Sequence, residues 1–347
     1  MVCVAAFIIL ALIGVFVAII SIFKPKVGRT YLVALKKSWG CLWKKVRLQK
    51  CETGFKDDVK NTLLSKVIIK HPKWVKPLSI IIEVVSVIIV IVAVWAVLTA
   101  IKSLLALWAL GSCNVTKPSA CSLGAEVCSI DESEPTNIIE STGRWFTEWG
   151  EIFEAIPEKF RTYNAEEYGF KYISDDGSTK PVAVDIFDPG CSVCMISYRN
   201  QKQAGFLDEY NVHLVAFAIQ DADGKYKFAN SEIIVRYMLS VNEVKQDIAI
   251  QIIDKIFTGT NSEGISYQNK FNNDYTHEEA VAKLESWLKE FDLTDEEIQK
   301  TRDLIYSEET TARIATNREI IENDLKVKGI PTMLYDGAKH TGLWKAE

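Results

Sequence analysis

The 347-residue sequence predicts an α/β domain with a long helical insertion, preceded by two transmembrane helices. Three observations support this fold class. Two long uncharged apolar runs lie within the first 111 residues, short β-branched and aromatic runs alternate with helical patterns after residue 168, and residues 231–326 are almost wholly helical in pattern. The average composition, with 48% hydrophobic and 24% charged residues, is that of a soluble protein and conceals this division of the chain.

Residues 1–23 are expected to form the first transmembrane helix. The run from Val2 to Phe23 contains no charged residue and is long enough to cross a bilayer as a helix. A cleaved signal peptide is the alternative, but it would open with Lys or Arg and end in a small-residue cleavage site, and this run does neither. Cys3 within it is expected to act as a small apolar residue.

Residues 78–111 are expected to form the second transmembrane helix. An uninterrupted apolar stretch, 84–101, lies between Glu83 and Lys102. A buried helix of a globular domain is the alternative, but the stretch is apolar on all sides rather than along one stripe, which favours a span.

The segment between the two spans, residues 24–77, predicts the orientation. It contains 15 Lys and Arg residues against 3 Asp and Glu residues, and short basic loops stay in the cytoplasm. The chain is therefore expected to be a two-pass protein of the plasma membrane, in contact with the lipid bilayer, with everything after residue 111 outside the cytoplasm. Cys41 and Cys51, in the basic loop, are expected to stay reduced. After Lys102 the chain has 24 basic and 41 acidic residues, which argues against a nucleic-acid partner.

Residues 112–136 are rich in Ser, Pro, Gly and Cys and are predicted to form a linker. If the linker lies outside, its cysteines are in an oxidising setting. We expect two of them to form a local structural disulfide, and the alternative is that one of them exchanges with Cys191. The linker cysteines are Cys113, Cys121 and Cys128.

Residues 138–160 are predicted to form an amphipathic helix at the start of a domain that extends over 137–347. The helix could lie on the membrane surface, but its polar face is acidic, so we expect it to pack on the domain. Its apolar residues at helical spacing are Ile138, Ile139, Trp145, Phe146, Trp149, Ile152, Phe153 and Ile156.

The other elements of this domain follow from local patterns. β-Branched and aromatic runs favour strands, Asp-Gly sequences favour turns, and a Thr followed by glutamates favours the start of a helix. The predicted strands are 168–173, 181–187 and 212–220, the predicted helices are 192–210, 231–257 and a series from Thr276 onward, and a strand, an Asp-Gly turn and a second strand are predicted within 326–344.

A C-x-x-C pair, Cys191 and Cys194, follows the strand predicted at 181–187. This position places Cys191 at a helix N-terminus, where unpaired N–H groups and the helix dipole favour the thiolate that attacks in disulfide exchange. Cys194, one turn further along, is positioned to resolve a mixed disulfide. Structural zinc is the alternative, but it needs four Cys or His ligands. The domain after residue 168 has no other cysteine and only scattered histidines, so no metal is expected.

Two segments, "VDIFDPGCSVC" (184–194) and the distant "VKGIPTMLYDG" (327–337), together resemble the thioredoxin superfamily. The helical block between them resembles the DsbA-like branch of thiol:disulfide oxidoreductases. The resemblance covers roughly residues 168–346, and it implies a thioredoxin-like fold with a helical insertion at 231–326.

The same resemblance implies roles for five residues. Cys191 attacks or is attacked, and Cys194 resolves. Asp185, six positions before the first cysteine, corresponds to a buried acid that takes the proton of the second sulfur. Ile330 and Pro331 correspond to a cis-proline turn that faces the cysteines and offers its backbone to a substrate strand.

The implied function is dithiol–disulfide exchange on exported proteins that contain thiols or disulfides, without a cofactor and with a membrane redox partner to recycle the cysteines. Oxidase is favoured over isomerase or reductase. Ser192-Val193, between the cysteines, matches neither the Gly-Pro of typical thioredoxins nor the Pro-His of typical DsbA proteins, which leaves the direction of electron flow open. The alternative is a non-catalytic binding module with a structural disulfide. The family usually closes with a further helix after the hairpin, which the residues up to Glu347 do not contain.

Overall fold

The computed structural model describes residues 74–113, 115, 127–130, 137–173, 177–221 and 223–345, and isolated residues between 32 and 47. The chain divides into two compact units, Met1–Ile101 and Lys102–Glu347. The span predicted at residues 1–23 lies outside the described residues, as does most of the basic loop.

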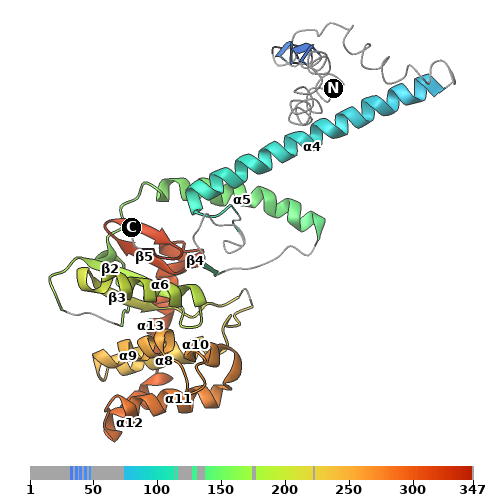
Figure 1. The fold of residues 1–347 in the computed structure, drawn as a ribbon. Helices are drawn as coiled ribbons and strands as arrows, with labels where there is room; N and C mark the ends of the chain where they lie inside the picture. Colours follow the sequence, from blue (N-terminus) through green and yellow to red (C-terminus); the bar gives the residue numbers. More distant parts are fainter. Residues whose placement is uncertain are drawn as a thin grey trace, which may run out of the picture. The chain divides into compact units, whose positions relative to one another are not determined.

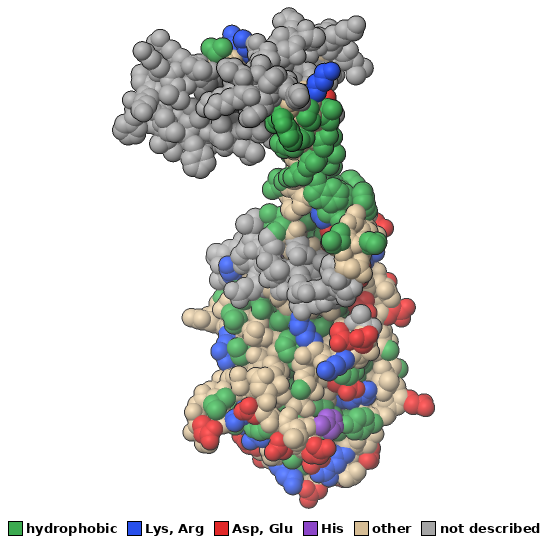
Figure 2. Space-filling view, turned by 90° about the vertical axis from the view of Figure 1, so that its right-hand side faces the viewer, with side chains coloured by type: hydrophobic (Ala, Val, Ile, Leu, Met, Phe, Trp, Pro, Cys, Tyr) green, Lys and Arg blue, Asp and Glu red, His purple; other side chains and the backbone are tan. Residues whose placement is uncertain are grey.

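Helix α4 (Val75–Leu110) coincides with the second predicted span. In the described part of the chain it is the one helix long and apolar enough to cross a membrane. Only 6% of its most apolar 18-residue stretch is buried. Its 36 residues extend about 54 Å at 1.5 Å per residue, longer than a bilayer core of about 30 Å. Exposed apolar side chains such as Ile91 and Leu104 cover it (Figure 2).

A four-stranded mixed sheet forms the centre of the second unit, in the order β3-β2-β5-β6 (Figure 1). Strand β2 runs parallel to β3 and antiparallel to β5, and β6 returns antiparallel to β5. Helices α6 and α7 connect the parallel pair, and this arrangement matches the thioredoxin-like fold expected from the sequence. The bounds are β2 (Val182–Phe187), α6 (Ser192–Ala204), α7 (Phe206–Glu209), β3 (Asn211–Ala216), β5 (Thr332–Tyr335) and β6 (Ala338–Thr341).

The predicted hairpin and the predicted strand at 181–187 are confirmed. Asp336 and Gly337 turn the chain between β5 and β6 with φ of 50° and 75°, the conformation of a two-residue hairpin turn. The single helix predicted at 192–210 is interrupted, because Gly205 adopts φ 79° and ends α6 in the left-handed conformation that glycine favours.

The predicted insertion lies between β3 and β5, and Figure 1 shows its helices gathered together beyond the strands. Thr276 begins one of them with a capping box, as the sequence indicated. The single helix predicted over 231–257 is wrong. The N–H groups of Val244 and Lys245 both bond to the Val241 carbonyl, which closes a turn between two helices. The insertion contains α8 (Ser231–Asn242), α9 (Gln246–Thr258), α10 (Tyr267–Asn269), η4 (Lys270–Asp274), α11 (His277–Glu290), α12 (Asp295–Ile305), α13 (Glu308–Glu319) and η5 (Ile320–Asp324).

The strand predicted at 168–173 is absent, and β3 is shorter than the predicted 212–220. Both backbone groups of Lys171 bond to the side-chain amide of Asn317, at 2.8 and 2.9 Å, instead of to a neighbouring strand. Ile173 donates its backbone N–H to the Leu214 carbonyl of β3, at 2.8 Å. A side chain of the insertion therefore replaces the strand ladder here.

The segment predicted as a linker contains a short strand, β1 (Cys128–Ser129), which pairs antiparallel with β4 (Gly329–Ile330). Helix α5 (Ile138–Glu158) follows it. Glu151 and Glu154 of α5 form ion pairs with Lys328 and Lys326 of the domain, at 3.6 and 3.8 Å, so the expected contact is present. The apolar part of the expectation is wrong, because fully buried Ile152 belongs to a cluster with Ala106 and Val115 while Phe146 and Phe153 remain exposed.

Candidate active site

Cys191 stands at the junction of strand and helix that the sequence predicted. The loop 188–190 leads from β2 into α6, and Cys191 is the N-cap residue of that helix. Its Sγ accepts a hydrogen bond of 3.4 Å from the backbone N–H of Cys194. Both side chains are buried. The Cys194 N–H, in the first helical turn, therefore points toward the sulfur, and this position at a helix N-terminus favours negative charge there.

Cys191 is bonded to a cysteine of the predicted linker. The disulfide joins Cys128 to Cys191, with 6.2 Å between their Cα atoms, and Cys194 is a free thiol. Cys128 is thus not part of a local disulfide within the linker, and its bond to Cys191 corresponds to the alternative for one of the three linker cysteines. Cys113 is disulfide-bonded, and Cys121 lies outside the described residues.

The two-residue strand β1 brings Cys128 to this position. It aligns with β4 over the residues that directly precede the predicted proline turn. The alignment consists of Cys128 opposite Ile330, Ser129 opposite Gly329, and a 3.1 Å hydrogen bond from the Ile130 N–H to the Lys328 carbonyl.

The predicted cis peptide bond is present between Ile330 and Pro331. The carbonyl oxygen of Ile330 lies 4.0 Å from the Sγ of Cys191. Residues separated by 139 positions in the sequence are therefore in contact, and the backbone of β4 runs directly beside the Cys191 sulfur.

Asp185 lies on β2 and is buried. Its Oδ2 accepts a hydrogen bond of 3.0 Å from the Nε2 of Gln201. Burial raises the pKa of Asp185 to about 6, and the Gln201 bond partly opposes this shift. Burial also raises the pKa of the Cys194 thiol well above its usual value, and the charges of Asp185 and Asp188 raise it further. The charge of Asp185 therefore acts on the Cys194 thiol.

Asp188 is a buried acid that the sequence analysis did not single out. It accepts hydrogen bonds from the N–H of Gly190 (2.7 Å), the N–H of Ile219 (2.8 Å) and the hydroxyl of Ser231. Burial raises its pKa to about 6 despite these bonds. The Asp-Pro-Gly sequence before Cys191 is a turn signal that could have indicated this role.

Amide side chains of the insertion bond the loop that carries Cys191. Gln268 Nε2 donates to the carbonyls of Pro189 (2.9 Å) and Cys191 (3.0 Å), and Asn272 Nδ2 donates to the carbonyl of Gly190 (2.8 Å). Three consecutive carbonyls are thus satisfied from another layer of the fold. No local sequence pattern predicts these contacts.

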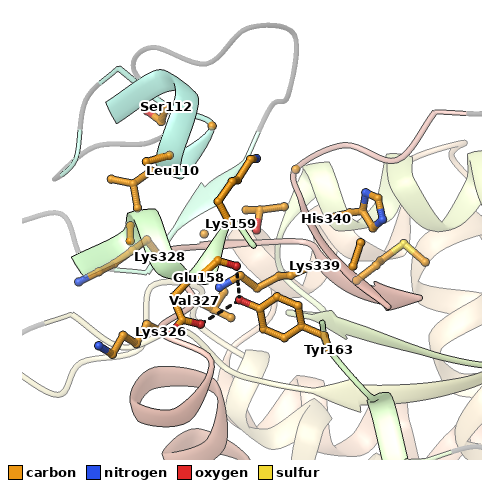
Figure 3. A pocket seen from close by; sticks show the side chains of 18 of the residues that line it. Leu110, Ser112, Glu158, Lys159, Tyr163, Lys326, Val327, Lys328, Lys339 and His340 are labelled. Atoms are coloured by element: carbon orange, nitrogen blue, oxygen red, sulfur yellow. Dashed lines mark hydrogen bonds between the residues drawn. The ribbon is translucent and has the colours of Figure 1, made fainter. Parts of the chain in front are cut away.

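A cavity of about 870 Å³ is lined in part by Lys328 and Gly329, at the start of β4. Figure 3 shows Lys326, Lys328 and Lys339 around it, with Tyr163 hydrogen-bonded to Glu158 at 3.0 Å. None of the described cysteines lines this cavity. Within the described residues, no three His, Cys, Asp or Glu side chains are grouped as metal ligands.

No family model and no curated protein matches the chain. Among solved structures, it is similar to a thioredoxin-like oxidoreductase from Silicibacter pomeroyi DSS-3 (19% identity, 47% of this chain and 79% of the other, TM-score 0.33). It is also similar to the thiol-disulfide exchange protein alpha-DsbA2 from Wolbachia pipientis (14%, 58% and 92%, TM-score 0.36) and to MdbA, a thiol-disulfide oxidoreductase from Corynebacterium diphtheriae (14%, 49% and 88%, TM-score 0.36). At these low TM-scores, none of the likenesses by itself identifies what this chain does.

Proposed function

We propose that this chain is a thiol:disulfide oxidoreductase that exchanges disulfides with extended protein substrates at Cys191. One observation supports this most directly. Cys191 is bonded to the cysteine of a strand that pairs with β4, and a substrate chain in a mixed disulfide would need the same arrangement.

The reaction follows from the position of the two cysteines. The Cys191 thiolate attacks a substrate disulfide, or a substrate thiolate attacks Cys191 when it is bonded to Cys194. In the oxidising direction, a second substrate thiolate attacks the substrate sulfur of the mixed disulfide and Cys191 leaves as a thiolate. In the reducing direction, Cys194 attacks the Sγ of Cys191 and the substrate sulfur leaves as a thiolate. Cys194 must lose its proton first, and the buried carboxylate of Asp185 is the acceptor in this proposal. A carboxyl pKa of about 6 suits it for general-base work near neutral pH.

The backbone of Ile330, before Pro331, is the proposed substrate-binding element. A substrate cysteine opposite Ile330 would direct its sulfur toward Cys191, since the Ile330 carbonyl is 4.0 Å from that sulfur. Backbone pairing of this kind accepts many sequences, because it uses groups that every residue has.

Within this proposal, the exchange reaction takes place on the outer side of the plasma membrane. The apolar length of α4 supports a membrane tether, and the basic loop 24–77 supports an outer location for the domain. A tethered domain would meet exported proteins as they emerge and would lie near a membrane redox partner. Oxidase remains the preferred direction within this proposal.

A second candidate is a non-catalytic binding module with a structural disulfide. The raised pKa of the buried Cys194 thiol favours it, because a thiol that stays protonated is a poor nucleophile. In this case the bond between Cys128 and Cys191 would be permanent.

A trapping experiment separates the two candidates. The full chain with Cys128→Ser and Cys194→Ala is incubated in detergent with a peptide whose single cysteine is bonded to glutathione, and after acid quenching and digestion the adducts at positions 191 and 194 are identified by mass. The oxidoreductase forms a stable mixed disulfide at Cys191, because glutathione leaves as a free thiol and neither Cys128 nor Cys194 is present to release the peptide. The matched control, Cys128→Ser with Cys191→Ala, forms none at Cys194. Absence of the adduct in the first variant, or equal adducts in both, would favour the binding module.

A further inference from the structure

We infer that residues 127–130, Val-Cys-Ser-Ile, are an internal substrate of this site, and that Cys128 and Cys194 compete for the bond to Cys191. The inference rests on the proposed function. It goes further because it assigns a third redox cysteine, a resting state in which the site is occupied, and a sequence preference for external substrates.

The backbone contacts of the segment extend beyond the disulfide itself. Strand pairing with β4 continues past Cys128 to Ser129 and Ile130. The Ser129 carbonyl also accepts a hydrogen bond of 3.2 Å from the Nζ of Lys227. A cysteine joined only by its sulfur would not need these contacts, so the segment is bound along its length.

The side chains of the segment are buried on both sides of the cysteine. Val127 is 7% exposed, Ser129 is fully buried, and Ile130, 9% exposed, belongs to the main hydrophobic core. A Cβ atom on Gly329 would lie 3.2 Å from the Cβ of Val127, so the glycine allows the close approach of the two strands. The site therefore fits a β-branched residue before the cysteine, a small residue after it and a branched apolar residue one position further.

The exchange between the two states is balanced without any other reactant. Cys194 gives its proton to the Asp185 carboxylate, and its thiolate attacks the Sγ of Cys191. The bond between Cys191 and Cys194 forms as the bond between Cys191 and Cys128 breaks. Cys128 leaves as a thiolate and takes up one proton, so no electron is gained or lost.

This exchange controls access to the site. While Cys128 is bonded, Cys191 is fully buried and β4 is paired, so an external chain finds neither the sulfur nor the backbone free. After exchange, the segment is held only by noncovalent contacts and a substrate strand can displace it. The raised pKa of the buried Cys194 thiol slows its attack on the Cys128–Cys191 bond.

Disulfide mapping of the full chain tests the inference. The chain is isolated without reductant, quenched in acid, alkylated and digested, and the linked peptides are quantified by mass spectrometry. We expect the 128–191 disulfide in the unmodified chain. Ile130→Asp, which removes a buried contact of the segment, should raise the ratio of 191–194 to 128–191 disulfide at least tenfold. Ile139→Asp is the matched control, because Ile139 is 86% exposed on α5; it should leave the ratio unchanged.

An external peptide tests the same site without a change that affects folding. With the Cys128→Ser, Cys194→Ala chain, the peptide AEVCSIDE (the sequence of residues 125–132), presented as a mixed disulfide with glutathione, should react at Cys191 at least tenfold faster than AEVCSDDE. Equal rates, together with an unchanged ratio in Ile130→Asp, would overturn the inference while leaving the proposed function intact. If neither peptide reacts with Cys191, the proposed function itself fails.

Discussion

The Oδ2 of Asp185 accepts a hydrogen bond from Gln201, whereas the Oδ1 of the same carboxylate has no hydrogen-bond partner among the described residues. The Oε1 of Gln201 is also unpaired there. A buried carboxylate with one oxygen unpaired is costly when charged and well suited to take up a proton.

Asp185→Asn should stabilise the fold at high pH. The pKa of Asp185 is about 6 in the folded state and 3.8 as the ordinary value, so the folded state binds this proton more tightly than the unfolded state. The stabilisation from protonation is complete below about pH 3.8 and is lost as the pH rises through 6. The neutral variant avoids that loss, and it should gain about 1–3 kcal/mol relative to the native chain between pH 4 and pH 8. Denaturant unfolding at both pH values measures this. Asp292→Asn, at an exposed position, is the control, and an equal gain there would contradict the assignment.

The same substitution should slow resolution of a mixed disulfide above pH 6. Above pH 6 Asp185 is charged and able to accept the Cys194 proton. A positioned general base raises a reaction rate about 100-fold, so its loss should slow resolution by about that factor. Below pH 6 the native carboxyl is protonated, so the native chain and the variant should converge. The measurement is the rate of peptide release from Cys191 in a Cys128→Ser background at pH 5 and pH 8. Equal slowing at both values would indicate a structural role instead.

Gly190→Ala should destabilise the domain by about 1–3 kcal/mol, because an added Cβ would overlap the Phe228 side chain and lie 2.8 Å from the Ser231 Oγ. Gly150→Ala is the matched control. That glycine lies within α5 with nothing within 4 Å of an added Cβ, so alanine should be neutral or stabilising by about 0.5–1 kcal/mol. Thermal unfolding of both variants compares them, and similar shifts would argue against the close packing at the loop.

Gln268→Ala should cost about 1–3 kcal/mol and also slow exchange at Cys191, because two buried carbonyls beside the sulfur lose their donor. Gln299→Ala removes an exposed glutamine that bonds only Asp303 among its described partners, and it should change little. The combination of unfolding and peptide-exchange assays distinguishes the two effects. Full exchange activity in Gln268→Ala would show that the loop keeps its geometry without these two hydrogen bonds.

The membrane topology can be tested with a thiol reagent that does not cross membranes. Ser286→Cys places a thiol on the exposed surface of α11, and it should react in intact cells. Cys41 and Cys51, in the basic loop, should react only after the membrane is permeabilised. Reaction of the loop cysteines in intact cells, with Ser286→Cys protected, would invert the proposed orientation.

Local patterns predicted those parts of the fold whose cause is local. The strand before Cys191, the helix that begins there, the Asp-Gly turn of the hairpin and the capping box at Thr276 all depend on residues within a few positions of one another. The cis peptide bond before Pro331 is expected from the family resemblance and not from a local pattern, and it is present.

The sequence-based predictions are wrong where residues far apart in the sequence determine the structure. The backbone of Lys171 is bonded by Asn317, 146 positions away, so its strand-like composition did not lead to a strand. The two residues of β1 are too few to show any periodicity, and their partner is about 200 positions further along. The pairing of Cys128 therefore could not be predicted from spacing.

The bond between Cys128 and Cys191, beside a free Cys194, has a practical consequence for redox measurements on this chain. Three sulfurs share one disulfide bond, so the form with Cys128 bonded and the inferred form with Cys194 bonded would be isomers of identical mass with the same number of free thiols. A titration of the denatured chain that only counts thiols would give one answer for both, and it would report an unchanged protein while the bond moves between Cys128 and Cys194.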